Sequence, residues 1–419
     1  MLFQTIDDKK ECSGIFHGGS MTYNPEEFPD DLTRTWKYTA SMEGYRGVDY
    51  AEIYALGKTL DEICPEHLQD EWKIVKERMQ AFFKANATAK ISTSQHCLFE
   101  LIPEKFLKDL CNMKNLISDW VIENTKRPPN YKHLLSTLEM LRDVEAYDIN
   151  IDPLKVRAIK NEPTARLVLD RLSRGYTKIK YNLFSTRTGR LTCTQRSFPI
   201  FTLKKQHREI IVPSNDMFVE LDFNGAELRT LLALSGQEQP TGDVHDWNVK
   251  NVFDSQVSRE ESKVLFFSWL YGSGSEELKK WRSSLSKVYN TRTLKSKHLD
   301  VDMIMTPYHR EIAASERLFV NYLIQSTTAD LCYEQFRKVW DIIRGTNSEV
   351  AFVLHDAIVV DLSLSDRPLL EKMMNAMAQT RYGQYGVNVS IGKNYGDMRY
   401  RHRSVQNGRS LQEGKELSS

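Results

Sequence analysis

One aspartate stands where an apolar stretch ends and a helical stretch begins. Met217–Leu221 is apolar except for Glu220, which predicts a strand, and Asp222 follows it directly. Apolar residues return at helical spacing over Ala226–Ser235, after a break at Gly225. The strand fixes the direction of the Asp222 carboxylate and the turn leaves its oxygens open, which suits a metal ligand. An aspartate that caps the following helix is the alternative interpretation.

A second aspartate lies in a predicted hairpin turn far along the chain. Two apolar, β-branched runs within Ser348–Leu362 flank His355 and Asp356. Because both flanking strands are hydrophobic, we expect Asp356 at the tip of the hairpin. Two aspartates on neighbouring strand ends can hold two divalent cations, and hard cations such as Mg²⁺ bind both carboxylates and phosphates. Two cations about 3.5–4 Å apart stabilise the attacking and the leaving oxygen of a phosphoryl transfer.

A stripe of cations and aromatic rings supplies the matching recognition chemistry. The segment SREESKVLFFSWLYG places a cation or an aromatic ring at every fourth residue. On a helix this spacing brings to one face Arg259, Lys263, Phe267 and Tyr271. Cations can hold a triphosphate, and an aromatic ring can stack on a base. A helix with one solvated end and one buried end would show the same pattern. His245, shortly before this segment, is either a further phosphate contact or a surface residue.

Positive charge is concentrated in one part of a nearly neutral chain. The 419 residues include 57 Lys and Arg against 56 Asp and Glu, yet residues 171–210 contain ten basic residues and a single acid, Glu209. Tyrosine and phenylalanine interleave with these cations, which favours contact with a phosphate backbone. Within this stretch Thr188-Gly189-Arg190 predicts a tight turn, and Arg190 forms either a loop salt bridge or a contact with a nucleic-acid groove.

A polar stripe follows one face of a predicted helix, Glu316–Asp330. It consists of Arg317, Asn321 and Gln325, at four-residue spacing in an otherwise apolar segment. If this face is buried, its polar groups need partners, and base acceptors in a minor groove would provide them. An exposed face is the alternative.

Helical spacing and turn residues predict the elements that position these side chains. Short strands and loops fill residues 1–60. Beyond the elements already named, we predict a strand at 387–391 and helices at 68–83, 107–122, 131–144, 161–174 and 367–382.

Composition limits the remaining possibilities. With 41% hydrophobic residues, the chain is long enough for two or three domains. Its six cysteines contain no CxxC pair, so we expect neither a zinc site nor a disulfide framework, as in a reducing cytosol. We find no signal peptide and no apolar run that could span a membrane, so we expect no membrane partner and a cytoplasmic location, the host cytoplasm if the chain is viral. Residues 1–70 contain fourteen acids against six basic residues, and are either a docking surface for replisome proteins or the remnant of a lost domain.

The motifs, in this order, resemble those of the DNA polymerase I family, the family A DNA polymerases. LDFNGAELR at 221–229 is similar to the family's motif A, RxxxKxxxFxxxYG at 259–272 to motif B, and LHDA at 354–357 to motif C. TGRLT at 188–192 and ERxxxNxxxQ at 316–325 are similar to two flanking motifs. The resemblance covers roughly residues 170–400.

This resemblance implies an α+β right-hand polymerase fold, with an antiparallel-sheet palm, helical fingers and a helical thumb. The parts that it implies are an N-terminal region of unknown role at 1–60, the helical thumb at 61–175, the first part of the palm at 176–238, the fingers at 239–313, the second part of the palm at 314–402 and a disordered tail at 403–419.

The resemblance also implies an activity, the template-directed addition of dNTPs to the 3′-hydroxyl of a primed DNA template, with two Mg²⁺ ions. Asp222, Asp356 and the main-chain carbonyl of Phe223 would bind the metal. Lys263 would act with the two aspartates in catalysis and, beside Arg259 and His245, hold the phosphates.

Other residues would recognise the nucleotide and the DNA. Phe267 would stack on the incoming base, Tyr271 would lie at the base of that pocket, and Glu227 would exclude a ribose 2′-hydroxyl. The residues implied to contact primer and template are Arg190, Arg317, Asn321, Gln325 and His355.

The chain departs from the family pattern in several places. Ala357 stands where the family usually has Glu, and Gly225 where it often has Gln. The missing Glu is an accessory acid in the family scheme, so we expect activity to survive. No 3′–5′ exonuclease domain fits ahead of the predicted thumb, and we expect a compact, phage-like polymerase without proofreading.

Two other functions remain open. A single-subunit RNA polymerase shares the palm and the Lys-to-Tyr-Gly helix, but Glu227 argues against it because it would block the ribose 2′-hydroxyl. A non-catalytic nucleic-acid-binding subunit with a degenerate palm is favoured only by Ala357, since both aspartates and the cation–aromatic stripe are retained.

Overall fold

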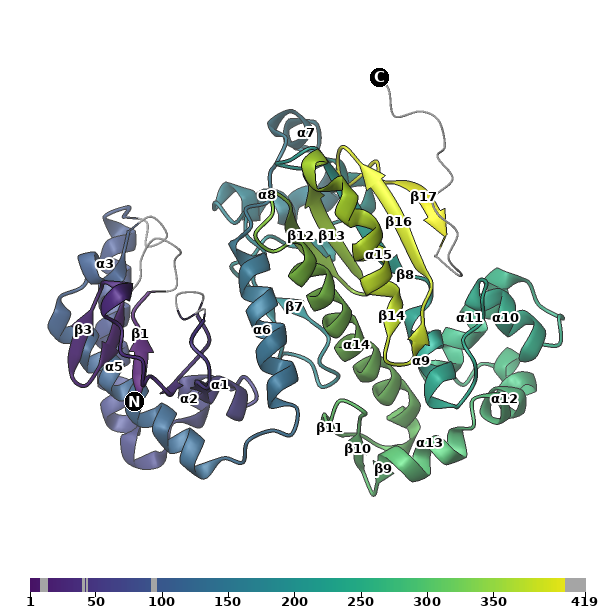
Figure 1. Ribbon diagram of the computed structural model, residues 1–419, viewed down its shortest axis with the longest axis horizontal. Helices are drawn as coiled ribbons and strands as arrows, with labels where there is room; N and C mark the ends of the chain where they lie inside the picture. The colour runs from purple at the N-terminus through teal and green to yellow at the C-terminus, as the bar shows by residue number, and fades with distance from the viewer. Residues whose placement is uncertain (8–13, 40–41, 43, 92–95, 404–419) are drawn as a thin grey trace. The chain divides into compact units, whose positions relative to one another are not determined.

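The computed structural model describes residues 1–7, 14–39, 42, 44–91 and 96–403. The chain divides into two compact units, at residues 1–143 and 144–419, and Figure 1 shows helices and strands in both. The α+β class expected from the sequence is confirmed. Residues 404–419, nearly all of the expected disordered tail, lie outside the described residues.

The first unit joins a small antiparallel sheet to long helices. Phe3 pairs with His17, and Phe16 with Met21, across three short strands. The apolar side of this sheet packs with helix residues in one cluster that includes Ile6, Phe16, Met79 and Leu107. The strands are β1 (Phe3–Thr5), β2 (Ile15–His17), β3 (Ser20–Thr22), β4 (Arg34–Thr35) and β5 (Asp49–Tyr50). The helices are α1 (Ala51–Tyr54), α2 (Leu60–Ile63), α3 (Gln69–Thr88), α4 (Leu98–Leu101), α5 (Glu104–Asn124) and α6 (Tyr131–Ala146), the last of which crosses the boundary between the units.

A five-stranded sheet forms the centre of the second unit, with strand order β12-β13-β8-β16-β17. Every pairing in it is antiparallel. Its strands are β8 (Met217–Phe223), β12 (Glu349–Leu354), β13 (Ala357–Leu362), β16 (Val387–Gly392) and β17 (Arg399–Arg403). Figure 1 shows α14 (Phe319–Ile343) and α15 (Leu370–Ala378) crossing this sheet. The predicted strand at 217–221, the predicted hairpin at 348–362 and the predicted strand at 387–391 are thereby confirmed as neighbours in one sheet.

Alternation along β8 gives the central strand two different sides. Val219, Leu221 and Phe223 point to one side and are buried. Glu220 and Asp222 point to the other side and are half-buried. The strand therefore carries its acidic side chains toward a single face of the sheet.

Helices α10 to α13 of the second unit share an apolar core with α9 and the start of α14, and this core includes Phe253, Phe266, Trp281 and Tyr289. The remaining helices of the unit are α7 (Pro153–Ala158), α8 (Arg166–Ser173), α9 (Ala226–Leu234), α10 (Val244–Asn251), α11 (Arg259–Leu270), α12 (Glu276–Val288) and α13 (Thr291–His298). Its short strands are β6 (Tyr181–Asn182), β7 (Thr192–Cys193), β9 (Leu299–Asp300), β10 (Met303–Met305), β11 (Glu311–Ala313), β14 (Gln379–Thr380) and β15 (Gly383–Gln384).

Local chemistry sets both ends of α11. Ser258 and Glu261 form a capping box at its start. At its end the Gly272 N–H donates to the Trp269 carbonyl at 3.0 Å, and the Ser273 N–H to the Ser268 carbonyl at 2.8 Å. This is a Schellman motif, with Gly272 at a φ of +73°.

The helices predicted at 68–83, 107–122 and 131–144 are present, and each continues past its predicted last residue. Two others are shorter than expected. The segment predicted from residue 161 starts as a 3-10 turn at Pro163, and the α-helix begins at Arg166. The helix predicted to reach Tyr382 ends at Ala378, because β14 pairs there with β15.

The expectation about cysteines is wrong at one position. Cys97 is disulfide-bonded, whereas Cys64, Cys111, Cys193 and Cys332 are free. Across the described ranges, no helix is both long and apolar enough to cross a membrane.

Candidate active site

Strand pairing brings the two predicted aspartates together. On β8 Asp222 lies opposite Ala357, the residue directly after Asp356. The Phe223 N–H donates to the Asp356 carbonyl at 3.3 Å, which ties the end of β8 to the β12–β13 turn. Asn388 on β16 donates from Nδ2 to Asp222 Oδ2 at 3.3 Å. Asp222 does not cap α9, whose N-cap is Gly225, so the capping interpretation is wrong.

The two carboxylates repel each other. Burial and the neighbouring charge of Asp356 raise the pKa of Asp222, and burial raises the pKa of Asp356. The charge of Lys263 opposes both shifts. A divalent cation between the carboxylates would remove the repulsion, and oxygen ligands of this kind suit a hard cation.

The described ranges contain no cluster of three or more His, Cys, Asp or Glu side chains that could hold a metal ion. A cation at the sheet edge would therefore be bound by the carboxylates of Asp222 and Asp356 and by main-chain oxygen. The carbonyl of Phe223, next to Asp222 on β8, is the predicted main-chain ligand.

Glu227 lies buried in the first turn of α9 between two partners. Arg190 forms an ion pair with Glu227 Oε1, and the Tyr271 hydroxyl donates to Oε2 at 3.5 Å. Burial raises the pKa of Glu227, and the charge of Arg190 opposes that shift. The salt-bridge interpretation of Arg190 is thus confirmed, and its contact with a nucleic acid stays a prediction.

The turn that carries Arg190 is anchored on α14. The Leu191 N–H donates to the Tyr333 hydroxyl at 3.0 Å, and this hydroxyl donates to the Gly189 carbonyl at 2.9 Å. Gly189 has a φ of +73°, and a Cβ there would lie 2.4 Å from Cζ of Arg310. A glycine is therefore required both by the backbone angle and by the guanidinium packed against it.

Helix α11 presents the predicted stripe along an accessible face. Arg259 donates from Nη2 to Asp243 Oδ2 at 2.8 Å, and Lys263 is exposed. The rings of Phe267 and Tyr271 stack with centroids 5.9 Å apart. Tyr271 is exposed, whereas Phe267 is half-buried against the apolar core. The stripe therefore fits both interpretations, and its contact with a nucleotide stays a prediction.

His245 is 5% exposed, so its interpretation as a surface residue is wrong. It lies in the first turn of α10, and its ring centroid is 6.2 Å from that of Phe267. Burial lowers the pKa of His245 to about 4, which keeps the ring neutral at pH 7. Its Nδ1 is buried without a hydrogen-bond partner. The ring thus borders the α11 stripe, where a phosphate contact was predicted.

The predicted DNA-contacting residues differ in their surroundings. Arg317, in the turn before α14, is exposed and donates to the Gly272 carbonyl at 3.3 Å. Asn321 and Gln325 are half-buried, and Oδ1 of Asn321 has no hydrogen-bond partner. His355 is exposed at the hairpin tip with a φ of +56°. Their contacts with primer and template stay predictions.

Three residues near the site were missed by sequence reasoning. Asp243 caps α10 and holds Arg259, Asn388 donates to Asp222, and the ring of Phe201 lies 5.5 Å from that of His355. A polar residue in the predicted strand at 387–391 was an available signal for Asn388. Phe201 had none, because only folding brings it to the hairpin.

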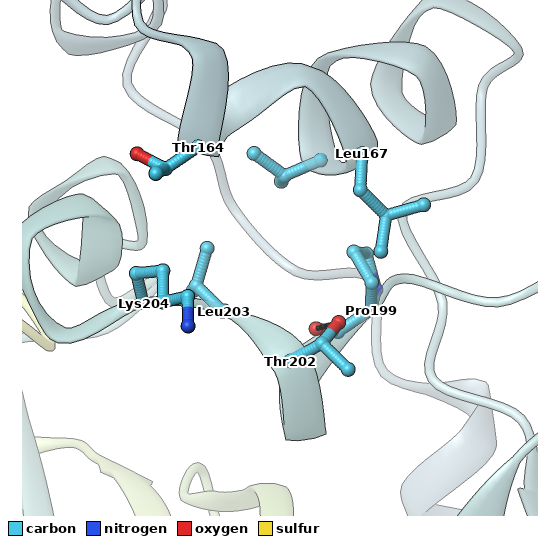
Figure 2. Close-up of a pocket in the computed structure, with 7 residues that line it drawn as sticks. Thr164, Leu167, Pro199, Thr202, Leu203 and Lys204 are labelled. Carbon is cyan, nitrogen blue, oxygen red and sulfur yellow. Dashed lines mark hydrogen bonds between the residues drawn. The ribbon is translucent and has the colours of Figure 1, made fainter.

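A pocket lies between residues 164–168, at the start of α8, and residues 199–204, which include a 3-10 turn at Ile200–Thr202 (Figure 2). None of the predicted site residues lines it, so it has no part in the candidate active site. Its lining residues are Thr164, Leu167, Val168, Pro199, Thr202, Leu203 and Lys204.

Two curated proteins resemble the chain in sequence, although no family model matches it. The chain is 20% identical over 336 residues to DNA polymerase I of Borreliella burgdorferi, a match that covers 66% of this chain and 36% of that protein. It is 24% identical over 243 residues to the DNA polymerase of Mycobacterium phage L5, covering 51% of this chain and 40% of that protein. The chain thus spans less than half the length of these relatives.

A solved structure agrees with these matches. The polymerase domain of Pol1 from M. smegmatis, in complex with DNA primer-template and dNTP, superposes with a TM-score of 0.60 at 13% identity, over 84% of this chain and 82% of that one. The chain is thus similar in sequence to DNA polymerases and in fold to a DNA polymerase domain. The resemblance inferred from motifs A, B and C is confirmed, and so is the α+β polymerase fold. The boundaries assigned to thumb, palm and fingers stay predictions.

The two departures from the family's motifs have local explanations. Gly225 has a φ of +65°, and a Cβ there would lie 2.5 Å from Cγ1 of Val244. A longer side chain would collide with α10. Ala357 is buried opposite Asp222, so β13 places a methyl group where the family usually has a carboxylate.

Proposed function

We propose that the chain is a template-directed DNA polymerase that adds dNTPs to the 3′-hydroxyl of a primed DNA template. The observation that carries this proposal is the pair Asp222 and Asp356 on adjoining strands, with the charge of Lys263 acting on both. Such a pair supports phosphoryl transfer between two cations. The names of the sequence relatives and the ligands of the M. smegmatis domain support DNA and dNTPs as substrates.

In this proposal the sheet edge positions the reacting groups. Asp222, Asp356 and the Phe223 carbonyl would hold two Mg²⁺ ions, which would supply Lewis-acid chemistry to the 3′-hydroxyl and positive charge to the phosphates. Asn388 keeps the Asp222 carboxylate oriented by its hydrogen bond. The tie between the Phe223 N–H and the Asp356 carbonyl keeps the two strand ends in register.

Helix α11 holds the incoming nucleotide. Lys263 and Arg259 bind the triphosphate, and the neutral ring of His245 adds a hydrogen bond. The ion pair with Asp243 holds the Arg259 guanidinium in place before the substrate arrives. Phe267 stacks on the base.

Glu227 selects the sugar. Its carboxylate is held by Arg190 and by the Tyr271 hydroxyl, and it excludes a 2′-hydroxyl from the floor of the pocket. Because a fixed, buried side chain cannot move aside cheaply, the site favours dNTPs over NTPs. This favours a DNA polymerase over a single-subunit RNA polymerase.

Primer extension with Mg²⁺ tests the proposal. We expect the wild type to extend a primed template with dNTPs and not with NTPs, and Asp356→Asn to abolish extension. Glu349→Gln, an exposed carboxylate on the same sheet, is the matched control and should extend normally. Duplex binding without extension by the wild type under any divalent metal would favour the non-catalytic subunit. Efficient use of NTPs would favour the RNA polymerase.

Two finer parts of the proposal have separate tests. We expect no release of nucleotides from a mismatched primer 3′ end, and release that survives Asp356→Asn would contradict the absence of proofreading.

If the acidic residues of the first unit dock a replisome protein, reversing the exposed charges of Glu26 and Glu27 should weaken capture of that protein and leave extension unchanged.

A further inference from the structure

Glu220 is a carboxylate at the sheet edge that the proposed roles leave unused. It lies two residues before Asp222 on β8, so both side chains project from the same face. Its neighbours in register are Val359 on β13 and Ser390 on β16. It is half-buried, and across the described residues no hydrogen bond or ion pair engages its carboxylate. A carboxylate withdrawn from water without a partner is costly unless something else binds it.

The groups around Glu220 also lack partners. The guanidinium of Arg208 lies 4.7 Å from the ring centroid of Tyr395, and its Nε is buried without a hydrogen bond. Tyr395 is 3% exposed, and its hydroxyl has no partner either. The charges that act most on Glu220 are Arg208 and Asp356, and those that act on Tyr395 are Glu220, Arg208 and Asp222. An unpartnered hydroxyl and an unpartnered carboxylate thus lie within electrostatic reach of the aspartate pair.

Strand β13, which pairs with β8, offers no side-chain oxygen directly opposite Asp222 or Glu220. Ala357 lies directly opposite Asp222 and Val359 directly opposite Glu220, so β13 places apolar side chains beside both acids. Asp361, further along this face of β13, already accepts hydrogen bonds from Tyr147, Ser214 and Asn215. The third carboxylate of the edge comes from β8 itself. Two residues along a strand separate the Cα atoms of Glu220 and Asp222 by roughly 6.8 Å, which leaves room for a water molecule between a bound cation and the Glu220 carboxylate.

We propose that Glu220 is a positioning residue of the cation site, whose carboxylate accepts hydrogen bonds from water on a divalent cation held by Asp222 and Asp356. The Tyr395 hydroxyl is a second partner of that water. This inference rests on the proposed function. Mg²⁺ bound by few carboxylates keeps several of its waters, and residues that orient metal ligands from the second layer are typically worth 10–100-fold in metal affinity.

Binding of Mn²⁺ to the full chain, without DNA or nucleotide, tests this role. Titration followed by electron paramagnetic resonance should show roughly tenfold weaker binding for Glu220→Gln, and wild-type binding for the control Glu349→Gln. Tyr395→Phe, which removes only a hydroxyl, should give a smaller loss in the same direction. Wild-type affinity in Glu220→Gln overturns the inference, whatever the result for Tyr395→Phe.

Two further measurements separate the possible failures. Thermal unfolding in EDTA should leave Glu220→Gln at least as stable as the wild type, whereas a loss of stability would mean that Glu220 serves as a structural partner of Arg208 and would overturn the inference. In Asp356→Asn we expect Mn²⁺ binding to be lost. If Asp356→Asn keeps its affinity, the cation site of the proposed function fails; if only Glu220→Gln keeps it, this inference fails alone.

Discussion

The carboxylates of the sheet edge and the cations of α11 are held in opposite ways. Asp222 and Asp356 come from distant parts of the sequence, and the register of β8 and β13 sets their separation. Arg259 and Lys263 come from one turn of one helix, on its accessible side. The aspartates repel each other, whereas Arg259 already has a partner in Asp243. The rigid sheet thus concentrates negative charge that needs a cation, and the helix surface offers side chains that can adapt to a substrate.

The largest expected effect comes from the sheet. Asp222→Asn removes one of two carboxylates that would hold the metal ions, so we expect the rate of primer extension to fall by about 10³-fold, or about 4 kcal/mol. Single-turnover extension measures this loss. Asp397→Asn, an exposed aspartate before β17, is the control and should retain the wild-type rate. A loss below tenfold would show that the sheet-edge carboxylates contribute no more to the extension rate than the cations of α11.

A smaller loss is expected from the helix. Lys263→Ala removes a cation that we propose binds the triphosphate, and we expect the extension rate to fall by about 10²-fold. Val264→Ala changes the next, exposed residue of α11 and controls for helix stability. Equal losses in Lys263→Ala and Asp222→Asn would mean that helix and sheet share the chemistry equally.

A still smaller effect, on the affinity for dNTP, is expected when the charge of Asp243, the ion-pair partner of Arg259, is removed. Asp243→Asn weakens the ion pair that holds Arg259, so we expect KM for dNTP to rise about fivefold, or about 1 kcal/mol, with kcat unchanged. Arg259 also contacts the exposed Glu260, and Glu260→Gln is the matched control with little expected change. A fall in kcat without a change in KM would contradict a role in holding the nucleotide.

The smallest effect is a pH dependence of stability without divalent cations. Burial and Asp356 raise the pKa of Asp222 from 3.8 to about 8, so the folded chain retains a proton that the unfolded chain has released. This contribution is complete below the ordinary pKa and is lost as the pH rises through the raised one. We expect the free energy of unfolding in EDTA to fall from about pH 5 to about pH 8. The fall should be smaller in Asp222→Asn, where burial still raises the pKa values of Asp356, Glu220 and Glu227.

Other groups do not obscure that measurement. Burial lowers the pKa of His245, which removes stability as the pH falls and so has the opposite sign. It is present in both proteins and cancels when Asp222→Asn is compared with the wild type. Identical pH profiles of the two proteins in EDTA would show that the aspartates do not repel each other in the folded state.

The sequence predicted those parts of the site that local patterns determine. The apolar run before Asp222, the paired runs around Asp356 and the four-residue stripe on α11 each specify one element and the place of a side chain on it. The capping box and Gly272 define both ends of α11 from residues within the helix and directly beside it.

Contacts between distant segments could not be predicted in this way. The Arg190–Glu227 and Arg259–Asp243 ion pairs depend on how separate elements meet. The burial of His245 depends on the packing of α10 against its neighbours, which no pattern around residue 245 reveals. The helix expected to reach Tyr382 ends early because a hairpin forms there, and pairing overrides the helical spacing.

The length of α14 between Gln325 and Tyr333 limits where residues can be inserted or deleted. It carries Asn321 and Gln325 directly, and through the Tyr333 hydroxyl it holds the turn with Arg190. One residue inserted between Gln325 and Tyr333 would rotate these two groups by about 100° relative to each other. The turn around Val301, which is 87% exposed, connects two short strands and carries no such coupling. Insertions and deletions, natural or engineered, should therefore be tolerated around Val301 and excluded from this part of α14.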